Sequence, residues 1–182
     1  MSEKQFLFSG FGGQGILFSG KFVAYKGLME DKNVSWLPSY GPEMRGGTAS
    51  CSVIISDEAV GSPIVSNPDI LIAMNLPSLD KYEKTVKSGG MIFADSTLIE
   101  RKVESDDVKV FYIPATKLAV DNKIPTLANM IIVGKVMKEL GEFNEESLTN
   151  ALKKVISAKR ADMLDVNLGA MKLGAEYKEK QK

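Results

Sequence analysis

Short apolar runs alternate with longer segments of helical spacing along most of the chain. Residues 6–9, 34–37, 48–56, 69–75, 91–94 and 108–113 predict strands, and the continuous run "DILIAMN" is typical of a strand buried on both faces. Helices are predicted over residues 15–29, 78–87, 127–140, 144–156 and 167–178, with a charged, frayed end at 179–182. Asn144 is a good N-cap and Gly141 a good helix stop, so these two residues separate the third helix from the fourth.

This alternation of strands and helices predicts one α/β domain over residues 1–182, a three-layer α/β/α sandwich. Pro38 is expected to close the second strand. Asp57 and Glu58 are expected to turn the strand 48–56 into a second short strand that runs toward Pro63. That hairpin would make the sheet mixed, although mostly parallel.

Composition removes several classes of function. The chain has 23 basic and 23 acidic side chains, and this net charge of zero gives no indication of a polyanion-binding surface, so nucleic acid is not a favoured partner. It has one cysteine and no histidine, which leaves no internal disulfide, no Ser–His–Asp triad and too few ligands for an iron–sulfur cluster or a structural zinc. Neither an export signal nor an 18-residue apolar stretch is present, so we expect a cytoplasmic protein that does not enter membranes.

The stretch "FSGFGGQG" follows the first predicted strand and opens the first helix. Gly10, Gly12 and Gly15 fall on the spacing G-x-G-x-x-G, with Gly13 and Gln14 between the last two. Such a turn lets the backbone and the helix N-terminus approach a phosphate closely. A dinucleotide site also needs an acidic residue at the end of the second strand, and "VSWLPSYG" has none. A tight turn that contacts an anion or another subunit is therefore favoured over an NAD or FAD site.

A second glycine-rich segment lies between the second and third predicted strands. Its notable residues are Tyr40, Gly41, Pro42, Glu43, Arg45, Gly46 and Gly47. Arg45, flanked by bare backbone, could grip a phosphate or carboxylate with two hydrogen bonds. It could equally pair with Glu43 or another surface acid. We expect this loop to lie at the same sheet edge as the glycine turn, the edge that carries ligands in open α/β sheets.

The two loops and the strand "SVIIS" together resemble the gamma subunit of 2-oxoacid:ferredoxin oxidoreductases, the pyruvate, 2-oxoglutarate and 2-oxoisovalerate synthases. The resemblance continues through "NPDILIAMN", "GGMIFADSTLI" and "IPTLANMIIVGKVM", and so covers roughly residues 4–175. The beta subunit of indolepyruvate oxidoreductases shares the pattern and is an alternative. So is a stand-alone nucleotide- or CoA-binding module.

The resemblance implies a Rossmann-like domain that carries no cofactor of its own and has no complete active site. In that family the complex converts a 2-oxoacid and CoA to acyl-CoA and CO₂ and passes electrons to ferredoxin. Thiamine diphosphate with Mg²⁺ lies on the alpha and beta subunits, and iron–sulfur clusters lie on the beta and delta subunits. These subunits are the expected partners, and the two glycine-rich loops are expected to face them and the CoA. The isolated chain is expected to be able to pair with itself, and Cys51 is interpreted as a packed small hydrophobe.

Overall fold

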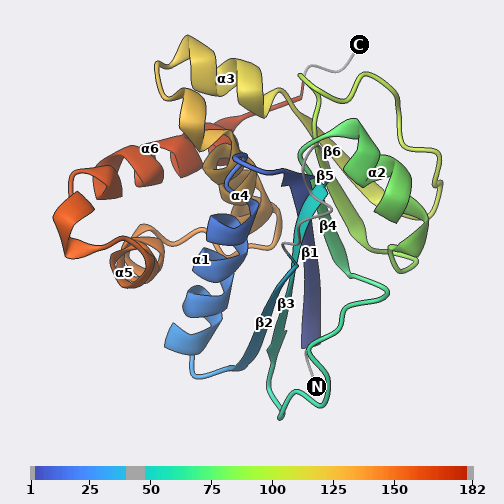
Figure 1. Cartoon of the computed structure of the whole chain (residues 1–182), viewed down its shortest axis with the longest axis horizontal. Coiled ribbons are helices and arrows are strands. Elements are labelled where there is room, and N and C mark those ends of the chain that lie inside the picture. Colours follow the sequence, from blue (N-terminus) through green and yellow to red (C-terminus); the bar gives the residue numbers. More distant parts are fainter. Residues whose placement is uncertain (1–2, 40–47, 180–182) are drawn as a thin grey trace.

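A computed structural model describes residues 3–39 and 48–179, and its centre is a six-stranded mixed sheet (Figure 1). The strand order is β2-β3-β1-β4-β5-β6. The strands are β1 (Glu3–Phe11), β2 (Asn33–Ser39), β3 (Thr48–Ser56), β4 (Ile70–Ala73), β5 (Met91–Asp95) and β6 (Lys109–Ile113). β1, β4, β5 and β6 pair in parallel, whereas β3 runs antiparallel to both of its neighbours, β1 and β2.

Helices cover both faces of the sheet, as the alternating pattern predicts (Figure 1). They are α1 (Ile16–Met29), α2 (Leu76–Tyr82), α3 (Ala115–Asp121), α4 (Ala128–Glu139), α5 (Glu145–Val155) and α6 (Met163–Glu176). α1, α3, α4, α5 and α6 pack on one face over the larger apolar core, and α2 packs on the other over a smaller one. The prediction of an α/β fold with a mixed, mostly parallel sheet is confirmed.

The predicted hairpin is wrong in its position. Residues 57–69 form no strand, and the antiparallel hairpin is made instead by β2 and β3. The physical reason is that β3 already has β1 on one side and β2 on the other, so no further strand can pair with it. Pro38 does not close the second strand either. It lies within β2, where an edge strand tolerates a residue without an N–H group.

The other predicted boundaries lie within four residues of the observed ones, except the end of the second predicted helix, and one helix is absent from the predicted set. That helix is α3, a short element whose buried residues are Ala115 and Ala119. The helix predicted over 78–87 ends as α2 at Tyr82, followed by a 3₁₀ turn at Glu83–Thr85. The predicted cap at Asn144 is confirmed, because its Oδ1 accepts a hydrogen bond from the N–H of Ser147 at 3.0 Å.

The crossing of α4 and α6 is tightly packed. Gly134 of α4 lies against the backbone of Met171, and Gly174 of α6 lies against the backbone of Ile131. A Cβ atom at either glycine would overlap a carbonyl oxygen of the facing helix. The two helices therefore touch backbone to backbone, and α6 is held as part of the core layer that supports α1.

Candidate functional site

The glycine turn lies at residues 12–15, between β1 and the N-terminus of α1. Gly13 and Gly15 adopt the left-handed conformation, with φ values of 92° and 74°. Within residues 3–39 and 48–179, no atom lies within 4 Å of the position that a Cβ would take at Gly13, so the described structure leaves the turn open at that point. Gly10, in contrast, lies inside β1, where a Cβ would come within 2.8 Å of Met74, and its role is close packing.

The N-terminus of α1 is open as well. Gly15 is its N-cap, no side chain caps it, and its first turn contains no acidic residue. The first N–H groups of a helix lack intrahelical partners and carry partial positive charge. This end of α1 is therefore suited to an anion or to carbonyl groups of another chain.

Gln14 ties the turn to the end of β4. Its Oε1 accepts a hydrogen bond from the Phe11 N–H at 2.6 Å, and its Nε2 donates to the Met74 carbonyl at 3.0 Å. The chain leaves β1 toward β2 and leaves β4 toward β5, so these two strands flank the point where the strand order reverses. Ligands of doubly wound folds lie in the crevice at that point. The side chain of Gln14 spans it, which argues against a dinucleotide there and agrees with the missing acidic residue in β2.

The second loop begins and ends at the same edge of the sheet. Ser39, the last residue of β2, is paired with Ser50, and Thr48, the first residue of β3, is paired with Phe11 at the end of β1. The loop between them therefore starts and finishes next to the glycine turn. Its candidate residues lie outside the described residues: Tyr40, Gly41, Glu43, Arg45, Gly46 and Gly47.

Asn129 of α4 supports the turn from behind. Its Nδ2 donates to the Gly15 carbonyl at 3.1 Å and to the Ser19 Oγ at 3.0 Å, so α4 is joined to the first turn of α1. Gly15 and Asn129 line a hollow of about 500 Å³, which the exposed Arg160 also lines. The sequence alone does not identify Asn129, because an asparagine within an apolar helical segment gives no signal of a contact 114 residues away.

Asp95 supports the same edge of the sheet at the end of β5. It is fully buried, and its carboxylate accepts hydrogen bonds from the Thr97 N–H at 3.1 Å and from the N–H and hydroxyl of Thr116 at 3.1 and 2.5 Å. These bonds attach the first turn of α3 to β5. An aspartate directly after the apolar run "MIFA" is the signal that could have identified this anchor.

Cys51 lies in β3 and is 1% exposed, which confirms its interpretation as a packed residue. Burial raises the pKa of its thiol to about 12, although contacts with Trp36 and Gly20 act in the opposite direction.

Among residues 3–39 and 48–179, no three His, Cys, Asp or Glu side chains come together in a way that could hold a metal ion. Within the same ranges, every helix is too short or too polar to cross a lipid bilayer.

These features define the class as an α/β protein of the doubly wound type, with an open glycine turn where the strand order reverses. Similarity to known proteins places the chain in one family. The chain belongs to the pyruvate ferredoxin/flavodoxin oxidoreductase family, whose model matches residues 5–177. Within that family it is of the gamma-subunit type. The gamma subunit of a keto/oxoacid ferredoxin oxidoreductase from Geobacter sulfurreducens has the same fold, with a TM-score of 0.79, 27% identity, and coverage of 95% of this chain and 96% of that one.

Two relatives show the range of chains in which this unit occurs. The 2-oxoglutarate synthase subunit KorC of Methanocaldococcus jannaschii is 36% identical over 153 residues, which is 82% of each chain. The ketoisovalerate oxidoreductase subunit VorA of Methanothermobacter thermautotrophicus is 42% identical over 171 residues, which is 93% of this chain and 35% of VorA. This chain therefore spans about a third of the length of VorA but most of the length of KorC.

Proposed function

We propose that this chain is the gamma subunit of a cytoplasmic 2-oxoacid:ferredoxin oxidoreductase, in a complex with alpha, beta and delta subunits. The complex would convert a 2-oxoacid and CoA to acyl-CoA and CO₂, with transfer of two electrons to ferredoxin. Thiamine diphosphate, Mg²⁺ and the iron–sulfur clusters would lie on the partner subunits and supply the decarboxylation and the electron transfer. This chain would contribute binding surfaces and architecture.

The observation that carries this proposal is the family match over residues 5–177, together with relatives named as subunits of 2-oxoacid oxidoreductases. The chemistry of the chain is consistent with a supporting role. It has no histidine, and its one thiol is buried with a raised pKa, so this thiol is a poor ligand and a poor nucleophile.

Within this function, the two glycine-rich loops would face the partner subunits and the CoA. The open turn at Gly13 and the uncapped N-terminus of α1 provide N–H groups for a phosphate. Since both ends of the second loop lie next to that turn, the guanidinium of Arg45 would be available to the same group. Gln14 would hold the turn rigid without contacting the ligand itself.

The function is tested by coexpression of this chain with the thiamine-diphosphate-binding and cluster-binding subunits of its host. The purified complex is assayed for ferredoxin reduction with pyruvate, 2-oxoglutarate and 2-oxoisovalerate. We expect CoA-dependent reduction with one of the three and none with this chain alone. Absence of association with such subunits would refute the proposal.

The role of the loops is tested separately in the assembled complex. Arg45→Gln removes the charge, and we expect the KM for CoA to rise about tenfold or more, as for a lost charge-assisted hydrogen bond. Lys138→Gln removes an exposed cation near the C-terminal end of α4, away from Gly15, and serves as the matched control, with an unchanged KM. An unchanged KM in both variants would show that the second loop does not bind CoA.

A further inference from the structure

β6 forms one free edge of the sheet. Among the described residues it pairs with β5 alone, and the hydrogen bonds at its two ends fix which residues turn toward that strand. The N–H of Lys109 donates to the Gly90 carbonyl at 2.9 Å, and the N–H of Ser96 donates to the Ile113 carbonyl at 2.9 Å. In a parallel pair, the residues that turn toward the partner strand alternate with residues that turn away.

The alternation directs the backbone of Val110 and Tyr112 outward. Each of these residues presents one N–H and one C=O at the edge. The two residues lie about 7 Å apart along the strand. No backbone or side-chain group in the described part of the chain forms a hydrogen bond with these four groups. Such a row of unpaired groups is matched by one kind of ligand, which is another extended polypeptide.

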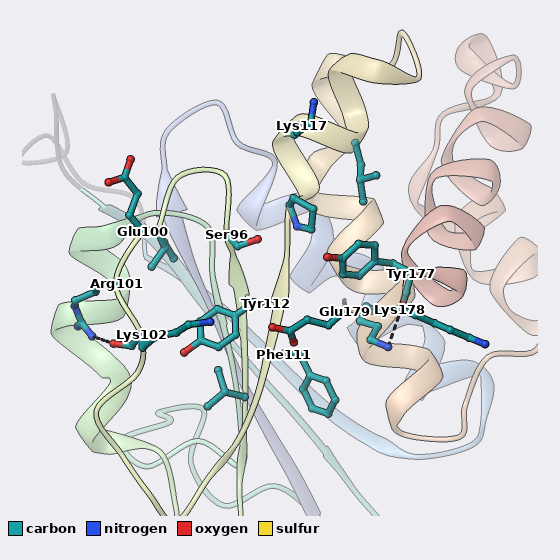
Figure 2. A pocket seen from close by; sticks show the side chains of 15 residues that line it. Ser96, Glu100, Arg101, Lys102, Phe111, Tyr112, Lys117, Tyr177, Lys178 and Glu179 are labelled. Carbon is teal, nitrogen blue, oxygen red and sulfur yellow. Dashed lines mark hydrogen bonds between the residues drawn. The ribbon is translucent and has the colours of Figure 1, made fainter. Parts of the chain in front are cut away.

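A hollow of about 1030 Å³ runs along this edge (Figure 2). Ser96 and the segment 99–102 line one side of it, and Tyr112 faces it from β6. The opposite side is formed by residues of α3, by Lys135 of α4 and by the segment 177–179 that follows α6. The edge is therefore a slot with two walls, which is the shape that a single strand would fill.

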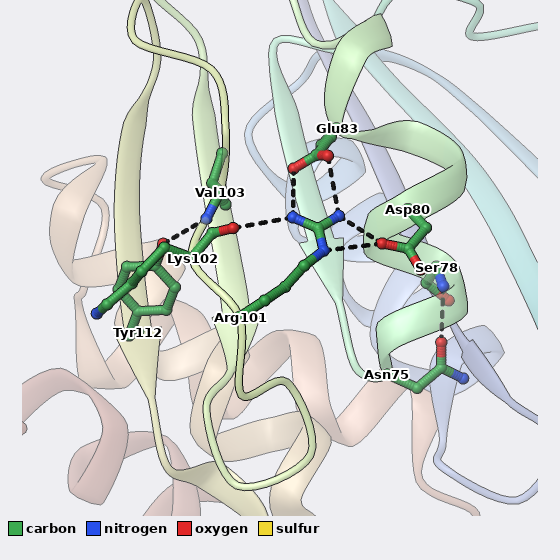
Figure 3. A network of polar contacts seen from close by, with 8 residues as sticks. All are labelled: Asn75, Ser78, Asp80, Glu83, Arg101, Lys102, Val103 and Tyr112. Atoms are coloured by element: carbon green, nitrogen blue, oxygen red, sulfur yellow. Dashed lines mark hydrogen bonds and ion pairs between the residues drawn. The ribbon is translucent and has the colours of Figure 1, made fainter.

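Both walls are held in place. On the first, the guanidinium of Arg101 contacts the carboxylates of Glu83 and Asp80 at 2.9 and 2.5 Å and also donates to the Lys102 carbonyl (Figure 3). Hydrogen bonds to Glu83 and Asp80 raise the pKa of Arg101 further above its ordinary value, so the clamp remains charged at any physiological pH. The next residue, Val103, donates its N–H to the hydroxyl of Tyr112 at 2.8 Å.

On the second wall, Lys135 holds the segment after α6 in place. The Nζ of Lys135 donates to the Tyr177 carbonyl at 3.2 Å and forms an ion pair with Glu139 at 2.6 Å. The segment after α6 is thereby held against α4. Because both walls are fixed in the free chain, an incoming strand would not have to order them, which favours binding.

The other free edge of the sheet, β2, is less suited to the addition of a strand. β2 carries Pro38, a common device against unwanted strand pairing, whereas β6 contains neither proline nor glycine. The slot also offers a cation. The Nζ of Lys102 lies 3.9 Å from the ring centre of Tyr112.

We propose that the β6 edge receives an extended segment of a partner subunit, which adds to the sheet as a seventh strand and places an acidic side chain beside Lys102. This inference rests on the proposed function. We take the occupant to be a partner subunit because relatives such as VorA carry this unit as about a third of one longer polypeptide, so further polypeptide is covalently joined to the unit there. A chain without that covalent link has to be held to its partners by non-covalent contacts.

Residue-resolved hydrogen exchange tests this, on the isolated chain and on the complex assembled with its partner subunits. In the isolated chain we expect fast exchange at the amides of Val110 and Tyr112 and slow exchange at Phe111. In the complex, the exchange of Val110 and Tyr112 should slow by about tenfold or more, because these amides acquire carbonyl partners. Unchanged exchange at both amides in an intact complex would overturn the inference while leaving the proposed function in place.

A matched pair of variants adds an independent readout. Val110→Pro removes an outward N–H without breaking the ladder to β5, and we expect partner binding to weaken about tenfold. Val110→Ala keeps that N–H and should bind within about threefold of the natural chain. Equal weakening by both would point to side-chain packing and contradict strand addition.

Two further outcomes are informative. Concentration-dependent protection of Val110 in the isolated chain would assign the edge to a second copy of the chain. Failure of any complex to form would remove this inference along with the proposed function.

Discussion

The substitution Gly134→Ala probes the backbone contact between α4 and α6. Gly134 lies in the middle of α4, and the position of its absent Cβ is 2.5 Å from both the Cα and the carbonyl carbon of Met171. The facing atoms belong to a helix backbone, so no side chain can rotate to make room. The helices have to move apart.

The size of the effect follows from that distance. Carbon atoms in contact rest about 3.5–4 Å apart, so α4 and α6 must separate by about 1 Å, which forfeits a quarter to a half of each dispersion contact across the crossing. Overpacking substitutions cost about 1–3 kcal/mol and occasionally more, and a rigid backbone places this site at the upper end. Alanine regains about 1 kcal/mol of helix propensity. We therefore expect the free energy of unfolding to fall by about 2–3 kcal/mol, which for a chain of this size lowers Tm by about 4–12 °C.

Urea denaturation followed by circular dichroism measures this, and α6 supplies a matched control. Gly169 lies in the same helix pair, but no atom of the described residues lies within 4 Å of its Cβ position. Gly169→Ala should therefore stabilise the chain by about 0.5–1 kcal/mol through helix propensity alone. The reasoning is refuted if Gly134→Ala unfolds at the same urea concentration as the natural chain, or if both alanine variants shift in the same direction.

Three further predictions concern the core and the turn. The buried thiol of Cys51, with its pKa raised to about 12, should resist a thiol-specific reagent at pH 8 until the chain is unfolded in urea; rapid reaction of the folded chain would contradict its burial. Burial acts to raise the pKa of Glu142, but hydrogen bonds from Lys4 and Lys26 outweigh it and lower the pKa. The stability from Glu142 is therefore present above its unfolded pKa and lost as pH falls through the lower folded value, so Glu142→Gln should lose less stability than the natural chain between about pH 5 and pH 3 in urea titrations. Asn129→Asp replaces a donor to the Gly15 carbonyl with a carboxylate and should cost about 1–3 kcal/mol in the same assay, and a neutral result would mean that this contact does not hold the turn.

The sequence predicts the fold well where local signals and tertiary structure agree. The apolar run that contains β4, the cap at Asn144 and the stop at Gly141 are all read from neighbouring residues, and the structure confirms each one. The hairpin after β3 could not be placed correctly, because the position of β3 between β1 and β2 depends on long-range pairing. The same holds for α3, whose first turn is anchored by Asp95 on another element.

The candidate site likewise combines features that the sequence predicts with contacts that it does not. The glycine turn and its left-handed residues follow from the spacing of the glycines, and the register of β1 with β3 supports the expectation that both loops share one edge. The contacts that hold the turn, from Gln14 to β4 and from Asn129 to α1, join residues 60 and 114 positions apart. Glu142 pairs with the buried Lys26 at 2.9 Å, although the two residues are 116 positions apart. No local pattern encodes contacts of this kind.

The central claim is that this chain works as the gamma subunit of a 2-oxoacid:ferredoxin oxidoreductase. The most direct test is to purify the chain from its native host through an affinity tag and to measure 2-oxoacid- and CoA-dependent ferredoxin reduction in the eluate. The account predicts co-purification of thiamine-diphosphate-binding and iron–sulfur subunits, with activity toward one of pyruvate, 2-oxoglutarate or 2-oxoisovalerate. Elution of the chain without those subunits, from cells whose extract has the activity, would contradict it.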